Sequence, residues 1–272
     1  MLALLHVSDV HFGPKHLPEL SGAVADLARC ERPSAVVVSG DLTQRAKPGQ
    51  FHAARRWIES LAVPVAFVPG NHDVPMYRFW ERLLAPFGAW KRHFAPELVR
   101  GHVGNGLAIL GLNTAYAWTT KHGRVLSGEL DRLEIELAAL PPATVRVVVA
   151  HHPLAASPRL GREPEARGGR SALVRLARAG VDLVLSGHLH QGFWIRLDPT
   201  DGAPVVLHSG TTTSSRGRGA ERGRNSLNWL EIDELSMRVE RRFWDPVECR
   251  FAVEEAIELP RRALRAPPPR AS

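Results

Sequence analysis

Short runs of Val, Leu and Ile recur along this chain, and five of them are followed closely by Asp, Asn or His residues. Apolar runs of this length, separated by helical patterns, are typical of strands buried in a layered α/β core. In an open α/β sheet, sites assemble in the crevice beyond the carboxyl ends of the strands. The pattern predicts strands at residues 2–7, 35–39, 64–68, 107–112, 145–150, 181–186, 205–208, 227–232 and 237–243.

Helical patterns lie between several of these strands. The clearest covers residues 128–140, where leucines fall on one face and two prolines follow; another covers residues 50–61. Later in the chain the helices give way to strands joined by turns such as residues 198–202. The second half is therefore predicted to complete a separate sheet packed on the first, with helices outside both sheets.

A chain of 272 residues can bury a sizeable core, and we expect a single domain over residues 1–259. Residues 75–100 are predicted to form a helical insertion that carries several aromatic side chains. Residues 214–224 are rich in Gly and Arg and are predicted to form a mobile loop. Residues 260–272 are predicted to form a flexible tail rich in Arg and Pro.

The charge of +7 and the pI near 10.2 favour anionic partners, because a positive field raises the local concentration of phosphate compounds. Many of the arginines lie in the last third of the chain. We expect them on solvated faces, with a nucleic-acid surface as the disfavoured alternative. The sequence leaves the oligomeric state open, a dimer included.

The two cysteines, Cys30 and Cys249, form no CxxC motif, so neither a disulfide framework nor a zinc knuckle is predicted. The first residues lack the charged start and cleavage site of a signal peptide. No run approaches the roughly 20 apolar residues of a membrane helix. We therefore expect no transmembrane segment and a cytoplasmic location.

The polar residues behind the strands form a set of metal-type donors. It contains carboxylate, imidazole and amide groups but no thiolate, which disfavours structural zinc and suits a hydrolytic centre. Seven donors are too many for one ion and fit two ions that share a bridge. The predicted metal-binding residues are Asp9, His11, Asp41, Asn71, His151, His188 and His190.

Spacing supports the same interpretation. In an extended segment residues i and i+2 point to the same side, so Asp9 with His11, and His188 with His190, could each aim two donors into one crevice. Asp41 is the natural bridge, since its carboxylate has two oxygens and it lies between the two pairs. Glycines that would allow close backbone approach precede three of the clusters, at Gly40, Gly70 and Gly187.

The motif series resembles the calcineurin-like metallophosphoesterases in order and spacing over residues 2 to about 245. The motifs are Asp9-x-His11, Gly40-Asp41, Gly70-Asn71-His72-Asp73, His151-His152-Pro153 and Gly187-His188-x-His190. Within that superfamily, the segments around Asp41 and His151 are most similar to bacterial class III cyclic nucleotide phosphodiesterases and related phosphohydrolases. The resemblance implies an α/β fold, a four-layer αββα sandwich of two mixed β-sheets flanked by helices.

The resemblance also implies roles for individual residues. Asp9, His11, Asp41 and His190 would hold one metal ion, and Asp41, Asn71, His151 and His188 the other. His72 would be the catalytic residue that contacts the phosphate or protonates the leaving oxygen, with Asp73 or another acceptor fixing its tautomer. The metals would be iron and manganese, with zinc or cobalt as alternatives, and a metal-bridging hydroxide would attack phosphorus. His152 and His208 are expected to have packing or supporting roles.

The resemblance implies a small phosphate-ester substrate, with a 3′,5′-cyclic nucleotide as the first choice. Asp41 is followed by Leu42-Thr43-Gln44-Arg45, which departs from the acidic and arginine pair of the protein phosphatases. One alternative is a nucleotide-diphosphate-lipid pyrophosphohydrolase of the UDP-diacylglucosamine type, whose apolar groove could use Trp80, Phe87, Trp90 and Phe94. Another is a non-catalytic or nucleic-acid-binding protein of the same fold. We expect these aromatic residues to form the core of the insertion itself.

Overall fold

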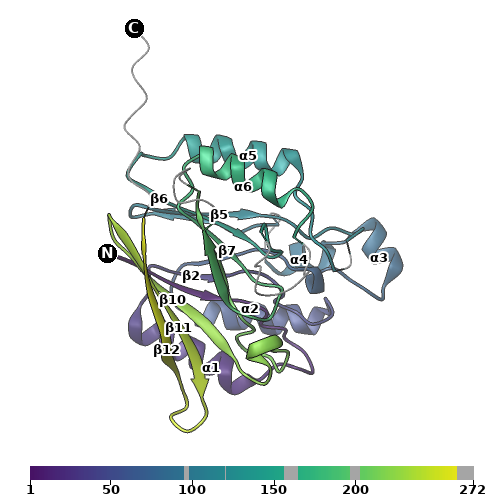
Figure 1. Ribbon diagram of the computed structural model, residues 1–272. Coiled ribbons are helices and arrows are strands. Elements are labelled where there is room, and N and C mark those ends of the chain that lie inside the picture. Colours follow the sequence, from purple (N-terminus) through teal and green to yellow (C-terminus); the bar gives the residue numbers. More distant parts are fainter. Residues whose placement is uncertain (95–97, 120, 156–164, 197–202, 262–272) are drawn as a thin grey trace.

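The first of two β-sheets joins the beginning of the chain to its end (Figure 1). The computed structural model describes residues 1–94, 98–119, 121–155, 165–196 and 203–261. In the first sheet the order is β12-β11-β10-β1-β2-β3, with β1, β2 and β3 parallel and the other three antiparallel. The strands are β1 (Leu2–Val7), β2 (Ala35–Val38), β3 (Val65–Phe67), β10 (Ser226–Ile232), β11 (Ser236–Asp245) and β12 (Arg250–Pro260).

The second sheet has the order β4-β5-β6-β7-β9-β8. Its four central strands are parallel, and β4 and β8 pair antiparallel at its edges. The parallel strands of both sheets thus present their carboxyl ends for a shared site. The strands are β4 (His102–Gly104), β5 (Leu107–Leu112), β6 (Val145–Ala150), β7 (Leu183–Ser186), β8 (Phe193–Arg196) and β9 (Val205–His208).

Helices cover the outer faces of both sheets. Figure 1 shows α5 and α6 along the top and α1 and α2 along the bottom, with the strands between them. Both α1 and α2 begin at a proline, a residue preorganised for the first helical turn. The helices are α1 (Pro18–Glu31), α2 (Pro48–Ser60), α3 (Phe79–Leu84), α4 (Gly88–His93), α5 (Ser127–Ala138) and α6 (Gly169–Arg178), with 3₁₀ turns η1 (Asn71–Asp73) and η3 (Gly219–Glu221).

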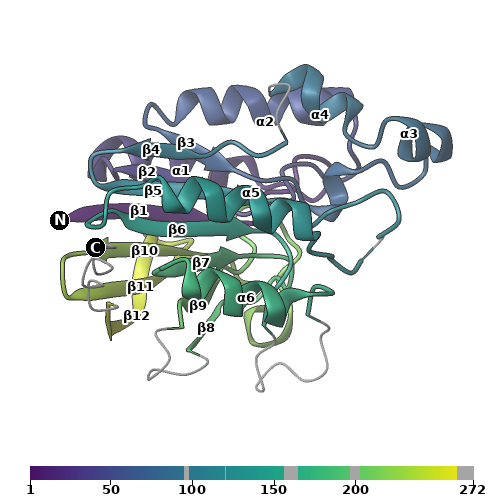
Figure 2. The ribbon, with the colours of Figure 1, turned by 90° about the horizontal axis from the view of Figure 1, so that it is seen from above.

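The core follows the alternation of side chains along each strand. In β1, Leu4 packs between the two sheets, whereas the next residue, Leu5, packs against the helices of the first sheet. A third apolar cluster lies between the second sheet and α5 and α6. Seen from above, α5 and α6 lie in front of the strands of the second sheet (Figure 2). The predicted αββα sandwich is confirmed.

The late part of the chain departs from the sequence prediction. Strands β10 to β12 do not join a separate sheet, because β10 pairs with β1, with Leu230 opposite Leu4. Pro260, the predicted start of the tail, ends β12, and the Arg261 guanidinium contacts Asp182 at 3.2 Å. Most side chains of β12 are exposed and many are charged, so no apolar run marks this edge strand. Residues 262–272 lie outside the described part of the chain.

The 75–100 region contains α3 and α4, and residues 95–97 fall outside the described ranges. Its aromatic side chains divide into two groups. Trp90 is fully buried and packs on Phe51 of α2 and Phe67 of β3, so α4 belongs to the main core. Phe79 and Trp80 of α3 are 64% and 70% exposed. The expectation of a self-contained aromatic core in this region is therefore wrong.

Candidate metal centre

The segments behind the strands have an unusual backbone. Among described non-glycine residues with positive φ, half belong to the predicted ligand set. L-residues adopt this left-handed region at a cost, and such strain clusters at functional sites. The segments are therefore not extended as expected, although Asp9 and His11 still direct their donors into one site. The φ values are 53° for Asp9, 53° for His11, 52° for Asp41, 71° for His188 and 57° for His190.

Two glycines allow the segments to approach each other. A β-carbon at Gly187 would collide with the Ser8 hydroxyl, and one at Gly70 would collide with the Asp41 carboxylate. The backbone of the loop that follows β7 therefore packs against a side chain of the loop that follows β1. The loop that follows β3 packs in the same way against the loop that follows β2. The close approach predicted at these two glycines is present.

Three residues form a first group of donors around one carboxylate oxygen. Asp9 Oδ1 lies 3.5 Å from His11 Nε2 and 3.5 Å from His190 Nε2. His11 Nε2 also lies 3.7 Å from Asp41 Oδ2. All four residues are buried. The structure thus brings together Asp9, His11, Asp41 and His190, as expected for the first metal site.

A second group meets the first at Asp41. His151 Nε2 lies 3.4 Å from Asp41 Oδ2 and 3.2 Å from Asn71 Oδ1. His188 Nδ1 lies 3.1 Å from the same Asn71 oxygen. The two groups therefore share one atom, Asp41 Oδ2, which matches the predicted bridge.

Hydrogen bonds orient both carboxylates toward the site. Asp41 Oδ1 accepts the His72 backbone N–H at 2.8 Å. Asp9 Oδ2 accepts the Ser8 hydroxyl at 2.8 Å and the His188 backbone N–H at 2.9 Å. The other oxygens, Asp9 Oδ1 and Asp41 Oδ2, are buried without a hydrogen-bond partner. Since buried carboxylate oxygens are normally satisfied, this arrangement fits a pair of cations.

The imidazole groups fit the same requirement. His151 Nδ1 lies 2.8 Å from the Ser39 carbonyl oxygen and therefore donates to it, so Nε2 faces Asp41 and becomes a lone pair once its proton is lost. His11 Nε2 is buried without a hydrogen-bond partner. Oxygen and nitrogen donors of this kind suit divalent first-row metals. The structure thus contains groups of Asp and His side chains that could hold metal ions.

The seven predicted ligands together are called the metal cradle, and the charges of Asp9, Asp41 and His151 within it affect one another strongly. Burial raises the pKa of Asp9 and Asp41, but neighbouring histidines, His190 and His151 first, hold both well below the usual value. Burial lowers the pKa of His188 to about 3. Burial also acts to lower the pKa of His151, but the Asp41 carboxylate overrides this effect and raises it to about 9. In the metal-free protein, His151 therefore carries the charge that balances Asp41.

His72 lies beside the first group, with its ring 4.9 Å from that of His11 and edge-on to it. His72 Nδ1 donates to the Gln44 carbonyl oxygen at 2.8 Å, so this carbonyl fixes the tautomer. Asp73 does not have that role. Its carboxylate instead accepts N–H groups of Leu42, Thr43 and Gly70, and the Thr43 hydroxyl.

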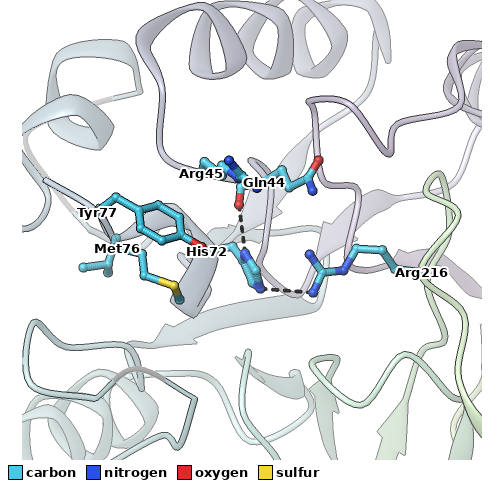
Figure 3. A pocket seen from close by; sticks show the side chains of 7 residues that line it. Gln44, Arg45, His72, Met76, Tyr77 and Arg216 are labelled. Carbon is cyan, nitrogen blue, oxygen red and sulfur yellow. Dashed lines mark hydrogen bonds between the residues drawn. The ribbon is translucent and has the colours of Figure 1, made fainter.

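A pocket of about 120 Å³ opens beside His72 (Figure 3). Arg216 lies on one side, with Nη2 3.3 Å from His72 Nε2, and Tyr77 lies on the other. Arg216 is not among the predicted site residues, because an arginine in a Gly- and Arg-rich segment is usually solvated. The signal that could have found it is the run of small polar residues 209–215 directly behind β9.

Two further histidines have supporting positions. His152 Nδ1 pairs with the Thr114 hydroxyl at 2.8 Å, and its ring packs 4.6 Å from that of His188. His152 also lies close enough to His151 and His188 to belong to a third group of metal-type side chains. His208 in β9 stacks on Phe193 at 4.0 Å. Both rings are buried among the strands that position the ligands.

The curated proteins that this chain resembles in sequence are named phosphodiesterases. The chain is 28% identical to a probable cyclic nucleotide phosphodiesterase of Synechococcus over 71% of this chain and 74% of that protein. It is 28% identical to a cAMP/cGMP dual specificity phosphodiesterase of Mycobacterium tuberculosis, over 69% of this chain and 61% of that protein. It is 27% identical to the Escherichia coli cAMP phosphodiesterase CpdA, over 57% of this chain and 54% of that protein. The match therefore spans less than two thirds of the last two relatives.

Solved structures share the fold at low identity. Yellow lupin purple acid phosphatase superposes with a TM-score of 0.73 at 15% identity, covering 94% of this chain and 53% of that one. GAP50, described as the anchor in the inner membrane complex of Plasmodium, superposes with a TM-score of 0.60 at 13% identity, over 93% and 89%. No helix in the described ranges has the length and apolar character needed to cross a bilayer.

The family model for calcineurin-like phosphoesterases matches residues 2–192, which include every predicted metal ligand. This match confirms the resemblance drawn from the five motifs, and with it the expectation of a phosphoesterase. The chain belongs to the calcineurin-like phosphoesterase family.

Proposed function

We propose that this protein is a metal-dependent enzyme that hydrolyses a small phosphodiester, with a 3′,5′-cyclic nucleotide as the first candidate substrate. The observation that carries the proposal is the pair of donor groups that share Asp41 Oδ2. A shared oxygen is what two adjacent cations need, and two-metal sites are common in phosphate-ester hydrolysis.

In this proposal Asp9, His11, Asp41 and His190 hold one ion, and Asp41, Asn71, His151 and His188 hold the other. Iron and manganese are the proposed metals, with zinc or cobalt as alternatives, since the donor set accepts all of them. When bound, the ions would activate a water molecule and offset the negative charge of the phosphate.

The chain's own residues would position the substrate and move one proton. His72 keeps its Nδ1 proton on the Gln44 carbonyl, so Nε2 is the atom that faces the pocket. From there the neutral ring can accept a hydrogen bond from the substrate, and the doubly protonated ring can contact a phosphate oxygen or pass its Nε2 proton to the leaving oxygen. Its backbone N–H also holds Asp41 Oδ1, which ties the position of His72 to that of the bridge.

The relatives support a phosphodiester substrate. Three of them are named cyclic nucleotide phosphodiesterases. A fourth, glycerophosphodiester phosphodiesterase GpdQ of Enterobacter lignolyticus, is 34% identical over 26% of this chain and 30% of that protein. A small phosphodiester is the class that these names have in common.

One observation favours a second candidate, a nucleotide-diphosphate-lipid pyrophosphohydrolase. Phe79, Trp80 and Leu84 of α3 are exposed, close in sequence to the pocket residues Met76 and Tyr77. Exposed apolar groups beside a site can receive an acyl chain. This candidate is therefore included in the test.

The test is a substrate panel on protein whose metal content has been measured. We expect roughly two metal ions per chain and faster hydrolysis of 3′,5′-cyclic AMP or GMP than of glycerophosphodiesters, phosphomonoesters or a nucleotide-diphosphate lipid. Faster turnover of the lipid would replace the first candidate by the second. Less than one ion after manganese loading, with no hydrolysis of bis(p-nitrophenyl) phosphate, would favour a binding protein of the same fold.

A further inference from the structure

The pocket beside His72 has one wall that the metal cradle does not explain. Its lining includes Arg216, a residue of a segment behind β9 that supplies none of the proposed ligands. The guanidinium lies 3.3 Å from His72 Nε2, and Figure 3 shows it pointing at the imidazole from the side opposite Tyr77.

The backbone around Arg216 is fixed to the ligand segments on both sides. The Ser214 hydroxyl is 3.3 Å from the Asp9 carbonyl oxygen, and the Ser215 N–H donates to Lys15 at 2.9 Å. Beyond Arg216, the Arg218 N–H donates to the carbonyl of His190 at 3.1 Å. Two proposed ligands of the first ion therefore position the segment, and Arg216 is placed with them.

The segment is also anchored away from the site. The buried Glu221 carboxylate accepts the Ser226 hydroxyl at 2.6 Å and the Arg241 guanidinium at 2.6 Å. The predicted mobile loop is therefore a hydrogen-bonded structure. An arginine on such a support loses little further freedom when it binds a ligand.

The partner of the Arg216 guanidinium is an imidazole rather than a carboxylate. Within the described part of the chain, its one side-chain hydrogen bond is to His72. Because the His72 Nδ1 proton is held by Gln44, Nε2 accepts from Arg216. A planar guanidinium offers five N–H donors in a fork that matches phosphate oxygens, so most of them remain for a ligand.

We infer that Arg216 binds a non-bridging phosphate oxygen of the substrate, next to His72. The ligand chemistry is that of a phosphate anion, and the inference rests on the proposed function. Negative charge on the equatorial oxygens must be stabilised as the phosphoryl group transfers, and a fixed guanidinium is suited to that task. Arg216 thus acts on the substrate, and the bond to His72 is its resting contact.

The test measures binding of inorganic phosphate to metal-loaded protein, together with diester hydrolysis. Arg216→Gln removes the charge and the guanidinium, and leaves a shorter polar side chain. We expect it to weaken phosphate binding by about tenfold or more, and to lower kcat/KM by roughly 10²–10³-fold, the usual effect of losing one such donor. Metal content should not change. Arg216→Lys, which keeps the charge but not the fork, should fall between Gln and wild type.

Two further variants test whether the effect belongs to the Arg216 guanidinium. Arg222→Ala removes an exposed charge from the same segment outside the pocket lining, and it should behave as wild type. Free guanidinium ion should restore part of the rate of Arg216→Ala. Unchanged phosphate affinity in Arg216→Gln, with folding and metal intact, would overturn the inference.

Failure of the proposed function would look different. Wild-type protein that hydrolyses no diester, yet binds phosphate more tightly than Arg216→Gln does, would refute the proposed function and leave the anion site in place. Wild-type protein that hydrolyses diesters, with no effect of Arg216→Gln on rate or phosphate binding, would leave the proposed function in place and refute the role of Arg216.

Discussion

At the scale of single residues, the two oxygens of Asp41 have different surroundings. Oδ1 is occupied by the His72 N–H, whereas Oδ2 is buried without a hydrogen-bond partner between the two donor groups. His72 contacts the bridge only through its backbone. Loss of the Asp41 side chain and loss of the His72 side chain should therefore have different consequences.

Asp41→Ala should remove metal and activity together, because both ions lose a ligand. His72→Ala should keep roughly two ions per chain and lose about 10²–10⁴-fold in rate, the range for an acid–base group. Metal analysis of the purified variants, followed by rate measurement, distinguishes them. An empty metal position in a folded His72→Ala protein would mean that His72 is a ligand.

His151 predicts a pH dependence for metal binding. Its pKa of about 9 in the metal-free protein, set by burial against the stronger pull of Asp41, means that it is protonated at pH 7. A metal ion needs the free Nε2 lone pair, so binding must release that proton. Affinity should rise by up to about tenfold per pH unit and level off above pH 9. Calorimetry in two buffers at pH 7 should detect about one proton per ion bound at this position; no release would contradict the pairing.

At the scale of elements, Asp73 joins the loops that carry the bridge. Its carboxylate accepts two N–H groups behind β2, at Leu42 and Thr43, and one behind β3, at Gly70. Burial, and then the Asp41 charge, raise its pKa to about 7. Asp73 thus acts on the shape of the cradle rather than on His72.

Asp73→Asn should destabilise the fold by about 1–3 kcal/mol at pH 8, because an amide cannot accept all of these donors. It should also weaken metal retention, since the two loops separate. Chemical denaturation and metal analysis measure the two effects. Asp233→Asn is the control, because this exposed carboxylate accepts the N–H groups of Leu235 and Ser236 in a turn. Equal metal loss in both variants would contradict a specific role for Asp73.

The segment before α3 supplies an aromatic wall to the pocket. Tyr77 is 74% exposed, and the Arg45 guanidinium lies 5.4 Å from its ring centre. Stacking of a base on an aromatic ring contributes roughly 1–3 kcal/mol. This ring could therefore select substrates that carry a base.

Tyr77→Ala should raise KM for cyclic nucleotides by about tenfold and leave KM for glycerophosphodiesters nearly unchanged. Tyr77→Phe should keep the effect of the ring. Phe79→Ala removes an exposed aromatic group that does not line the pocket and serves as the control. A similar rise in KM for both substrate classes would remove Tyr77 from substrate selection.

The parts of the molecule that side-chain chemistry encodes could be predicted from the sequence. The buried strands and the ligands behind them could be predicted, because apolar runs and polar residues alternate clearly there. Strand β12 was missed because an exposed edge strand carries no such run. The Gln44 carbonyl could not be predicted because every residue has one, and Arg216 because its meaning depends on where β9 places it.

At the scale of the whole molecule, the cradle joins the two sheets. Asp9, Asp41 and Asn71 follow strands of the first sheet, whereas His151 and His188 follow strands of the second. Apolar packing holds the sheets together along their facing sides. Cations at the cradle would add a cross-link at one end of that contact.

Chelation should therefore lower the melting temperature and loosen the two sheets at this end. For an ion at 100 times its Kd, the lost stabilisation is about 2.7 kcal/mol. Calorimetry with and without chelator measures the change, and hydrogen exchange locates it at the loops behind β6 and β7. Asp41→Ala should melt at the same temperature in both conditions. A shift of the same size in that variant would mean that chelation acts elsewhere.

The left-handed backbone at five of the proposed ligands implies a conflict within the chain. Asp9, Asp41 and the two histidines of the β7 loop occupy conformations that glycine would adopt with less strain. Glycine at these positions would relax the apoprotein while abolishing its capacity to hold metal. A change that favours stability alone would therefore remove the donors that the proposed metal site needs.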